Sequence, residues 1–227
     1  MTERDLRSST RRSLLTGLGG AALGAGAMSI ARADQHTGFQ PQRHEEDAWY
    51  DVMPGTHRAW VDTSFAEGGM EGLHYARNIL EGHKMAYDGS YSDYAMIVCW
   101  RSYSTVLGYK DPIWARYGEI IADETGLKDP RTGRPYTVNP VTLPDRLDLP
   151  NFGATLEVAL ERGIKFALCN AATTYFADVF ARETDGSAKQ IHADLVLNAV
   201  PESRFVATGV LATTRAQEFG YSLLYSA

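Results

Sequence analysis

Two cysteines and the residues that follow them are the side chains of this sequence best suited to chemistry. Cys169 ends a short apolar run and is followed at once by Asn170 and other helix-capping residues. A thiol at a helix N-terminus lies beside unpaired backbone N–H groups and the positive end of the helix dipole, which favour the thiolate. Cys169, with Asn170 beside it, is therefore a candidate nucleophile, sulfur carrier or redox centre. The alternative is a small buried side chain, as most free cysteines are.

The other cysteine is followed by an arginine at the end of a second apolar run. Cys99 lies inside the unbroken stretch 94–100, so we expect it in the core. Arg101 is the better candidate here, because a cation at the end of a strand could hold an anion or lower the pKa of a nearby thiol. Its alternative is an ordinary surface ion pair. The sequence leaves open whether Cys99 and Cys169 come close enough to form a disulfide.

Other common site motifs are missing from the sequence. The histidines form neither an HExxH motif nor a pair four residues apart, which disfavours metal binding. No GxGxxG follows a predicted strand, and neither GxxxxGK[ST] nor GxSxG occurs, so a nucleotide cofactor and a hydrolase of the GxSxG type are not expected. The formal net charge of −6 argues against a nucleic-acid partner. We therefore expect no cofactor and no metal ion.

The rest of the chain predicts alternating strands and helices that would hold these residues at one edge of a sheet. Strands are expected over 57–63, 94–100, 165–169, 204–208 and 221–225. Helices are expected over about 70–82, 109–121, 155–162, 175–181 and 210–219. Strands separated by helices favour a mostly parallel sheet in a three-layer α/β/α fold. Such sheets bind ligands at the carboxyl ends of their strands, where Cys169 is expected.

Two segments depart from this alternation. Residues 125–150 contain seven Gly or Pro residues, which interrupt helix and strand, so we expect an irregular insertion of low local stability. A loop of this length is either functional, for example a lid, or a surface excursion. Residues 34–56 are polar and turn-rich and predict a tether that leads into an α/β domain over 57–227.

The first 33 residues are similar to an export signal. Arg11 and Arg12 are adjacent and precede a weakly apolar, glycine-rich stretch that ends in the small-x-small site 31–33. Paired arginines at this point are typical of the twin-arginine (Tat) signal. An uncleaved anchor or a basic tail is the alternative. Export would place the protein in the periplasm, an oxidising compartment, with no membrane span once the signal is cleaved.

Several segments together resemble the DsrE/DsrF-like superfamily, small α/β proteins linked to sulfur relay, and in particular a Tat-exported branch of it. These segments are His57–Asp62, Ile97–Arg101, Phe166–Asn170, Val206–Val210 and Arg215–Tyr221. The resemblance implies that Cys169 accepts sulfur as a persulfide, that the chain forms a homo-oligomer, and that a sulfur-donor or sulfur-acceptor protein is its partner. The sequence departs from the small cytoplasmic carriers of the superfamily in its export signal and in the insertion at 125–150.

Two functions are compatible with these patterns. The first is an exported sulfur carrier or thiol-redox protein that works through Cys169. The second is a non-catalytic periplasmic binding or assembly module in which both cysteines are structural. The reactivity of the two thiols toward an alkylating agent separates the two functions.

Overall fold

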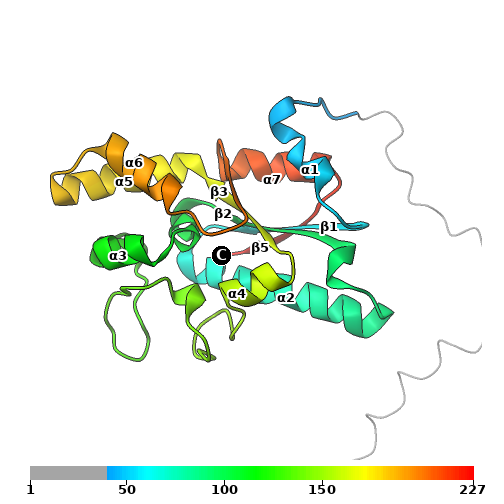
Figure 1. Cartoon of the computed structure of the whole chain (residues 1–227), viewed down its shortest axis with the longest axis horizontal. Helices are drawn as coiled ribbons and strands as arrows, with labels where there is room; N and C mark the ends of the chain where they lie inside the picture. Colours follow the sequence, from blue (N-terminus) through cyan, green and yellow to red (C-terminus); the bar gives the residue numbers. More distant parts are fainter. Residues whose placement is uncertain (1–39) are drawn as a thin grey trace, which may run out of the picture. The chain divides into compact units, whose positions relative to one another are not determined.

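Within residues 40–227, which the computed structural model describes, five parallel strands form a single sheet (Figure 1). The strands are β1 (His57–Thr63), β2 (Tyr94–Trp100), β3 (Lys165–Cys169), β4 (Ser203–Val206) and β5 (Ser222–Ser226), in the order β4-β3-β2-β1-β5. Every pairing between neighbours is parallel. The predicted α/β class, with a parallel sheet between layers of helices, is confirmed. The expected signal peptide over 1–33 lies outside the described residues.

The helices cover both faces of this sheet. They are α1 (Trp49–Val52), α2 (Ala66–Tyr87), α3 (Asp111–Thr125), α4 (Leu156–Glu161), α5 (Asn170–Thr184), α6 (Ala188–Leu197) and α7 (Gly209–Glu218). Short 3₁₀ segments lie at Glu45–Asp47, Tyr91–Asp93, Ser102–Gly108 and Pro140–Thr142. Among the described residues, none of the helices combines the length and the apolar character that a membrane span needs.

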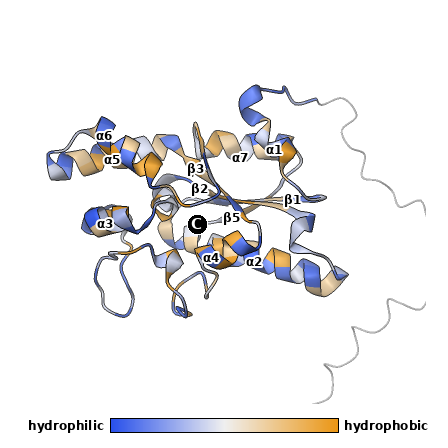
Figure 2. Ribbon diagram, viewed as in Figure 1, coloured by the Kyte–Doolittle hydropathy of each residue, from blue (hydrophilic) through white to orange (hydrophobic). Residues whose placement is uncertain are grey.

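The sheet separates two apolar clusters because successive side chains of a strand point to opposite faces. Val61 and Val98 belong to the larger cluster, with buried residues of α2, α3 and α5. Trp60 and Cys99 belong to the smaller cluster, with buried residues of α7 and with Tyr50 of α1. Most of the helices show apolar residues alongside polar ones (Figure 2), as expected for helices that bury one face against a sheet.

Strand limits agree with the sequence more closely than helix limits do. The expected ranges of β1, β2 and β3 match the structure residue for residue. α5 begins at Asn170, earlier than expected, so that Cys169 itself is the N-cap. α6 was not expected from the sequence, and only Ile191 and Leu195 of this helix are buried, which gives little helical periodicity to detect.

The insertion at 125–150 is packed against the domain. Asn139 is fully buried, and its Nδ2 donates hydrogen bonds to the carbonyl oxygens of Leu107 at 2.7 Å and Tyr109 at 2.8 Å. Arg146 is buried as well and forms ion pairs with two aspartates of the same segment. Glycine and proline prevent regular backbone pairing here, but side chains supply the missing partners. The structure therefore differs from the irregular, weakly held loop that the composition predicts.

The later part of the expected tether also belongs to the folded domain, since residues 41–227 form one compact unit. Tyr50 is 1% exposed, and its hydroxyl donates to the carbonyl oxygen of Ala212 at 3.0 Å. In return the hydroxyl of Tyr221 donates to the carbonyl oxygen of Tyr50 at 2.9 Å. The many polar residues of 34–56 conceal this single aromatic anchor. The compact unit therefore begins at residue 41, whereas the sequence places the start of the domain at residue 57.

Candidate functional site

The chain leaves the neighbouring strands β3 and β4 toward opposite faces of the sheet. After β3 it enters α5, whose Phe176 and Phe180 belong to the larger apolar cluster. After β4 it enters α7, whose Ala212 and Ala216 belong to the smaller one. Open α/β sheets bind ligands in the crevice that such a switch creates at the carboxyl ends of the strands.

A pocket of about 440 Å³ lies at this crevice. It is built from residues that follow β2, β3 and β4, together with the end of β3 itself. We call it the carboxyl-edge pocket, and it is lined by Arg101, Ser102, Tyr103, Cys169, Ala171, Ala172, Tyr175, Thr208, Gly209 and Val210. Cys169 and Arg101, which the sequence places at the ends of two strands, both line this pocket.

Cys169 lines this pocket at the N-terminus of α5. Its Sγ accepts a hydrogen bond from the backbone N–H of Ala172 at 3.4 Å. Its carbonyl oxygen accepts one from the hydroxyl of Thr173 at 3.0 Å, which fixes the start of the helix. Cys169 is 6% exposed. The residue is thus almost fully buried, and the pocket is the cavity that it lines.

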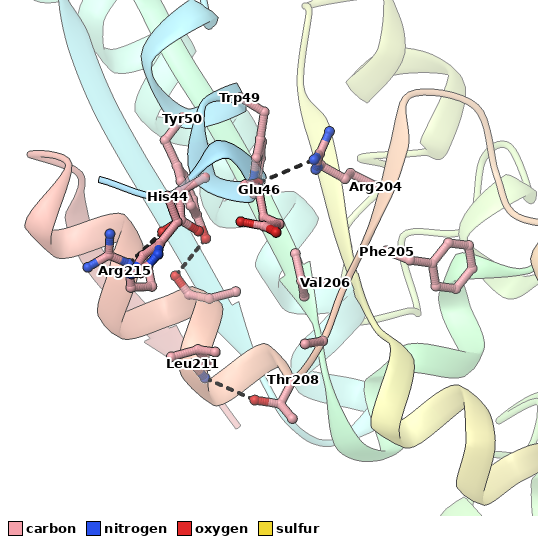
Figure 3. A pocket seen from close by; sticks show the side chains of 13 residues that line it. His44, Glu46, Trp49, Tyr50, Arg204, Phe205, Val206, Thr208, Leu211 and Arg215 are labelled. Carbon is pink, nitrogen blue, oxygen red and sulfur yellow. Dashed lines mark hydrogen bonds and ion pairs between the residues drawn. The ribbon is translucent and has the colours of Figure 1, made fainter. Parts of the chain in front are cut away.

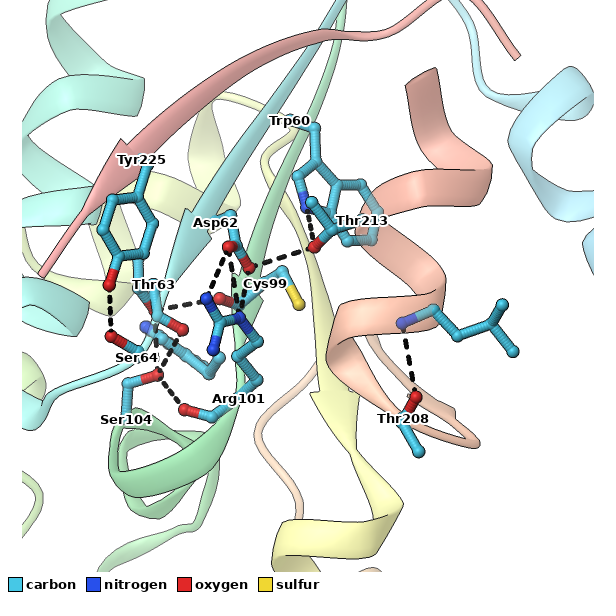
Figure 4. A network of polar contacts seen from close by, with 12 residues as sticks. Trp60, Asp62, Thr63, Ser64, Cys99, Arg101, Ser104, Thr208, Thr213 and Tyr225 are labelled. Atoms are coloured by element: carbon cyan, nitrogen blue, oxygen red, sulfur yellow. Dashed lines mark hydrogen bonds and ion pairs between the residues drawn. The ribbon is translucent and has the colours of Figure 1, made fainter. Parts of the chain in front are cut away.

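Arg101 lines the same pocket, but Asp62 of β1 balances its charge (Figure 4). The Nε of Arg101 donates to Oδ1 of Asp62 at 2.9 Å, and Nη2 donates to Oδ2 at 2.9 Å. The hydroxyl of Thr213 in α7 also donates to Oδ1 of Asp62 at 3.0 Å, and it accepts a hydrogen bond from Nε1 of Trp60 at 3.0 Å. Hydrogen bonding to Asp62 raises the pKa of Arg101. Arg101 is thus neither the free cation nor the surface ion pair that the sequence suggests, but half of a bidentate, mostly buried pair.

Cys99 is fully buried on the same face of the sheet, close to this pair (Figure 4). Burial, and after it the negative charge of Asp62, raises the pKa of the Cys99 thiol well above its ordinary value of 9.0. The thiol therefore keeps its proton, which agrees with the expected core position. Both Cys99 and Cys169 are free thiols.

Asn170 does not join the other two candidates. Its Oδ1 is 2.9 Å from Nε2 of His192 in α6, and the two residues line a separate pocket with Thr174. Asn170 is not among the residues that line the carboxyl-edge pocket, although Cys169 and Ala171 on either side of it are. The structure therefore does not bring Asn170 together with Cys169 and Arg101, and its contact with His192 connects α5 to α6.

Sequence reasoning missed several residues of the site. Asp62 and Thr213 hold Arg101, and Tyr103 and Tyr175 form aromatic walls of the carboxyl-edge pocket. A signal for Asp62 was available, because an acidic residue inside an otherwise apolar strand needs a partner when it is buried. No comparable signal marks Thr213, which is an ordinary residue of an amphipathic helix.

A second pocket of about 440 Å³ lies beside the edge strand β4, between α7 and the segment around α1 (Figure 3). Its basic side chains are bound within the fold. Nε of Arg215 lies 2.7 Å from Oδ2 of Asp47, and Nη2 of Arg204 donates to the carbonyl oxygen of Glu46 at 3.3 Å. Because this pocket holds no thiol, the carboxyl-edge pocket is the stronger candidate for chemistry.

Comparison with known proteins adds no assignment. The sequence matches no protein-family model and no curated protein. Among residues 40–227, no three His, Cys, Asp or Glu side chains gather in a way that could hold a metal ion. Function is therefore inferred from the carboxyl-edge pocket and its thiol.

Proposed function

We propose that this chain is an exported, DsrE-like thiol protein in which Cys169 accepts sulfur as a persulfide or exchanges disulfides. The observation that carries the proposal is the position of Cys169, which lines a pocket at the strand switch and caps a helix of 15 residues. Further support comes from the segments that resemble the DsrE/DsrF-like superfamily. Three of them contribute Arg101, Cys169 and the turn 208–210 to the same pocket.

Sulfur transfer at this site balances without an added oxidant. The thiolate of Cys169 attacks the terminal sulfur of a donor persulfide, R–S–SH. The bond between the two donor sulfurs breaks, the donor leaves as the thiolate R–S⁻, and Cys169 becomes a persulfide. The N–H of Ala172 lies within hydrogen-bonding distance of the sulfur and can donate to it during the exchange. An acceptor thiol removes the outer sulfur by the same exchange.

Mass spectrometry of the native protein tests this reaction. After exposure to a small persulfide donor, the peptide that contains Cys169 is expected to gain the mass of one sulfur atom. The Cys169→Ser variant should gain none, and the Cys99→Ala variant should react as the unaltered chain does. A Cys169 that stays unmodified, while a free cysteine derivative in the same solution is converted, would contradict the proposal.

A non-catalytic binding or assembly module is the second candidate function. The low exposure of Cys169 and the second pocket, which has the same volume but no thiol, favour it. Both cysteines are structural in that case. The native protein would then react with iodoacetamide at neither Cys169 nor Cys99 until it unfolds, whereas the sulfur carrier reacts at Cys169 alone.

Export through the Tat route and a periplasmic location are part of the proposal and rest on residues 1–33. Replacing Arg11 and Arg12 together by lysine should leave the precursor in the cytoplasm. Normal amounts of cleaved protein in the periplasm would exclude this route. A homo-oligomer and a sulfur-donor or sulfur-acceptor protein as partner are proposed from the family resemblance.

A further inference from the structure

We infer that the carboxyl-edge pocket takes a neutral, apolar sulfur compound, such as an aromatic disulfide, and discriminates against anionic ones. This substrate class rests on the proposed function of Cys169 and makes it more specific. It follows from the charges around the pocket, from its walls and from the side chains at its mouth.

The pocket offers no free positive charge to an anion. Of the described residues that line it, only Arg101 is charged, and Asp62 already binds it through two parallel hydrogen bonds. If Arg101 turned toward a ligand, it would leave Asp62, which is 5% exposed, as a buried carboxylate without a counter-charge. An anion that entered would lose its hydration and would meet a cation whose charge Asp62 already balances.

The side chain of Arg101 is also held in place by α7. A Cβ atom on Gly209 would lie 2.4 Å from Cβ of Arg101 and 3.0 Å from its Cδ, so the helix backbone passes directly against the arginine stem. Glycine at this position permits the close approach. The contact leaves Arg101 little room to reorient toward a ligand, and the ion pair with Asp62 is part of a rigid wall.

Two helix N-termini border the pocket and on their own favour negative charge, but the fold already uses part of this capacity. At α5, the N–H of Ala172 donates to Sγ of Cys169. At α7, the N–H of Leu211 donates to the hydroxyl of Thr208 at 3.3 Å. The positive potential is therefore directed at the reacting sulfur and at a protein hydroxyl. These two N–H groups are therefore not available to a separate anion.

The walls and the mouth of the pocket are mostly apolar, with Ser102 and Thr208 as the uncharged polar residues among them. Ala171 and Ala172 line it from α5, and Tyr103 packs with its ring centroid 6.2 Å from that of Phe65. Val210 is 58% exposed at the start of α7. A volume of about 440 Å³ falls within the range of about 300–1,000 Å³ that small-molecule pockets occupy. Apolar side chains left open around a concave site are typical of a surface that an apolar ligand covers.

Tyr175 completes this mouth and is fixed in position. It is 43% exposed, and its hydroxyl donates to Oε2 of Glu124 in α3 at 2.5 Å. The hydroxyl of Tyr175 thus already has a hydrogen-bond partner within the protein. The face of its ring is left as the contact surface for a ligand. An aromatic compound that reacts with Cys169 can therefore rest on Tyr175, Tyr103 and Val210.

Two methanethiosulfonate reagents test this selectivity on the native protein. In each, the Cys169 thiolate attacks the sulfenyl sulfur, the S–S bond breaks, methanesulfinate leaves and a mixed disulfide forms. The benzyl reagent is neutral and the 2-sulfonatoethyl reagent is anionic. With both rates divided by those of N-acetylcysteine amide, we expect the benzyl reagent to react at Cys169 at least about tenfold faster, a discrimination within reach of an apolar pocket. Equal normalised rates would overturn the inference.

Two neighbouring residues of α7 provide a matched pair of variants. Val210 lines the carboxyl-edge pocket, whereas Leu211 lines the second pocket, and they are 58% and 53% exposed, so that a lysine at either position can extend into solvent. Val210→Lys should raise the normalised rate of the anionic reagent several-fold and reduce the preference for the benzyl reagent. Leu211→Lys should change neither rate. Equal effects of the two substitutions would mean that the added charge changes the reaction rates from a distance. The pocket itself would then not distinguish the anionic from the neutral reagent.

Binding to an unreactive variant separates failure of the inference from failure of the proposed function. Cys169→Ser should bind benzyl methyl sulfide, with shifts of the Ala171 and Ala172 amide signals in NMR spectra, and should not bind methyl 2-sulfonatoethyl sulfide. If the variant binds only the benzyl compound but Cys169 of the unaltered protein takes up no persulfide sulfur, the proposed function is wrong. The inference that the pocket binds apolar compounds would still stand. If Cys169 accepts sulfur but neither selectivity nor binding is observed, the inference alone is wrong.

Discussion

The ion pair between Arg101 and Asp62 joins three elements of the fold through side chains alone. Asp62 belongs to β1, Arg101 follows β2, and Thr213 of α7 donates the additional hydrogen bond. A carboxylate at this depth is stable only because each of its oxygen atoms has a donor. The same contacts that neutralise the pocket therefore also connect α7 to the sheet.

Removal of Asp62 should destabilise the protein strongly. Asp62→Ala leaves Arg101, whose side chain is only 19% exposed, without a counter-charge, so we expect the free energy of unfolding to fall by about 3 kcal/mol. Urea denaturation measures the change. Asp51→Ala is the control, because Asp51 is 51% exposed and its ion pairs with Arg43 and Arg58 should contribute less than about 1 kcal/mol. Similar losses in the two variants would mean that the Arg101–Asp62 pair is not buried in solution.

At the scale of elements, strands and their ends could be predicted, and the contacts between elements could not. β2 and β3 are continuous apolar runs, so their limits and the position of Cys169 follow from local sequence alone. The hydrogen bonds to Asp62 come from residues 39 and 151 positions away, and no local pattern encodes such pairs. Which way the Asn170 side chain points depends on where α5 begins. The sequence locates the first residue of a helix only to within about one or two positions, so this orientation could not be predicted.

The insertion at 125–150 shows a similar limit. Its glycines and prolines do prevent helix and strand, as the composition predicts. Its order comes instead from buried polar side chains: Asn139 binds three backbone groups, and Arg146 binds the carboxylates of Asp129 and Asp148. Composition does not reveal which asparagine or arginine of a loop will be buried.

Asn139 should be the main anchor of this insertion. Asn139→Ala removes the donors to the carbonyl groups of Leu107 and Tyr109, which lie just before α3. It leaves the buried Leu107 carbonyl without its side-chain donor, whereas Nε1 of Trp114 still donates to the Tyr109 carbonyl at 3.1 Å. We expect a loss of about 2–3 kcal/mol in the free energy of unfolding, measured by urea denaturation. Thr137→Ala, at an exposed position of the same segment, should change it by less than about 0.5 kcal/mol. An Asn139→Ala variant as stable as the Thr137→Ala variant would show that the insertion is not held there.

At the scale of the whole molecule, the smaller apolar cluster should make stability fall at alkaline pH. Burial raises the pKa of Cys99 well above 9.0, that of Tyr50 strongly, and that of Tyr221 from 10.0 to about 12. The unfolded chain loses these protons at the ordinary values while the folded chain retains them, so the unfolded state binds fewer protons as the pH rises. The free energy of unfolding should therefore decrease from about pH 9 toward pH 12.

Urea denaturation at a series of pH values between 7 and 12 measures this decrease. Tyr221→Phe should make the decrease shallower between pH 10 and about 12, because that variant lacks one of the groups with a raised pKa. Tyr87→Phe is the control, since Tyr87 is 77% exposed and should not alter the profile. A stability that stays constant up to pH 12 would be incompatible with the burial of these groups.

The segment 41–56 covers the face of the sheet that carries this cluster, and Tyr50 is its anchor. Tyr50→Ala removes a ring whose centroid lies 5.0 Å from that of Phe219 and 5.9 Å from that of Trp60, together with the hydrogen bond to Ala212. We expect the free energy of unfolding to fall by about 3–5 kcal/mol, as for other large aromatic side chains in a core, and thermal unfolding at neutral pH measures it.

Val52→Ala provides the comparison, because Val52 lies in the same helix but is 78% exposed, and the substitution should leave the unfolding temperature almost unchanged. The expected cleavage after residue 33 precedes this segment, so a mature chain would keep Tyr50. A chain shortened further, to begin at residue 57, should lose as much stability as Tyr50→Ala or more, because it exposes Trp60 and Phe219. If the shortened chain unfolds at the same temperature as the full domain, the segment is a tether after all.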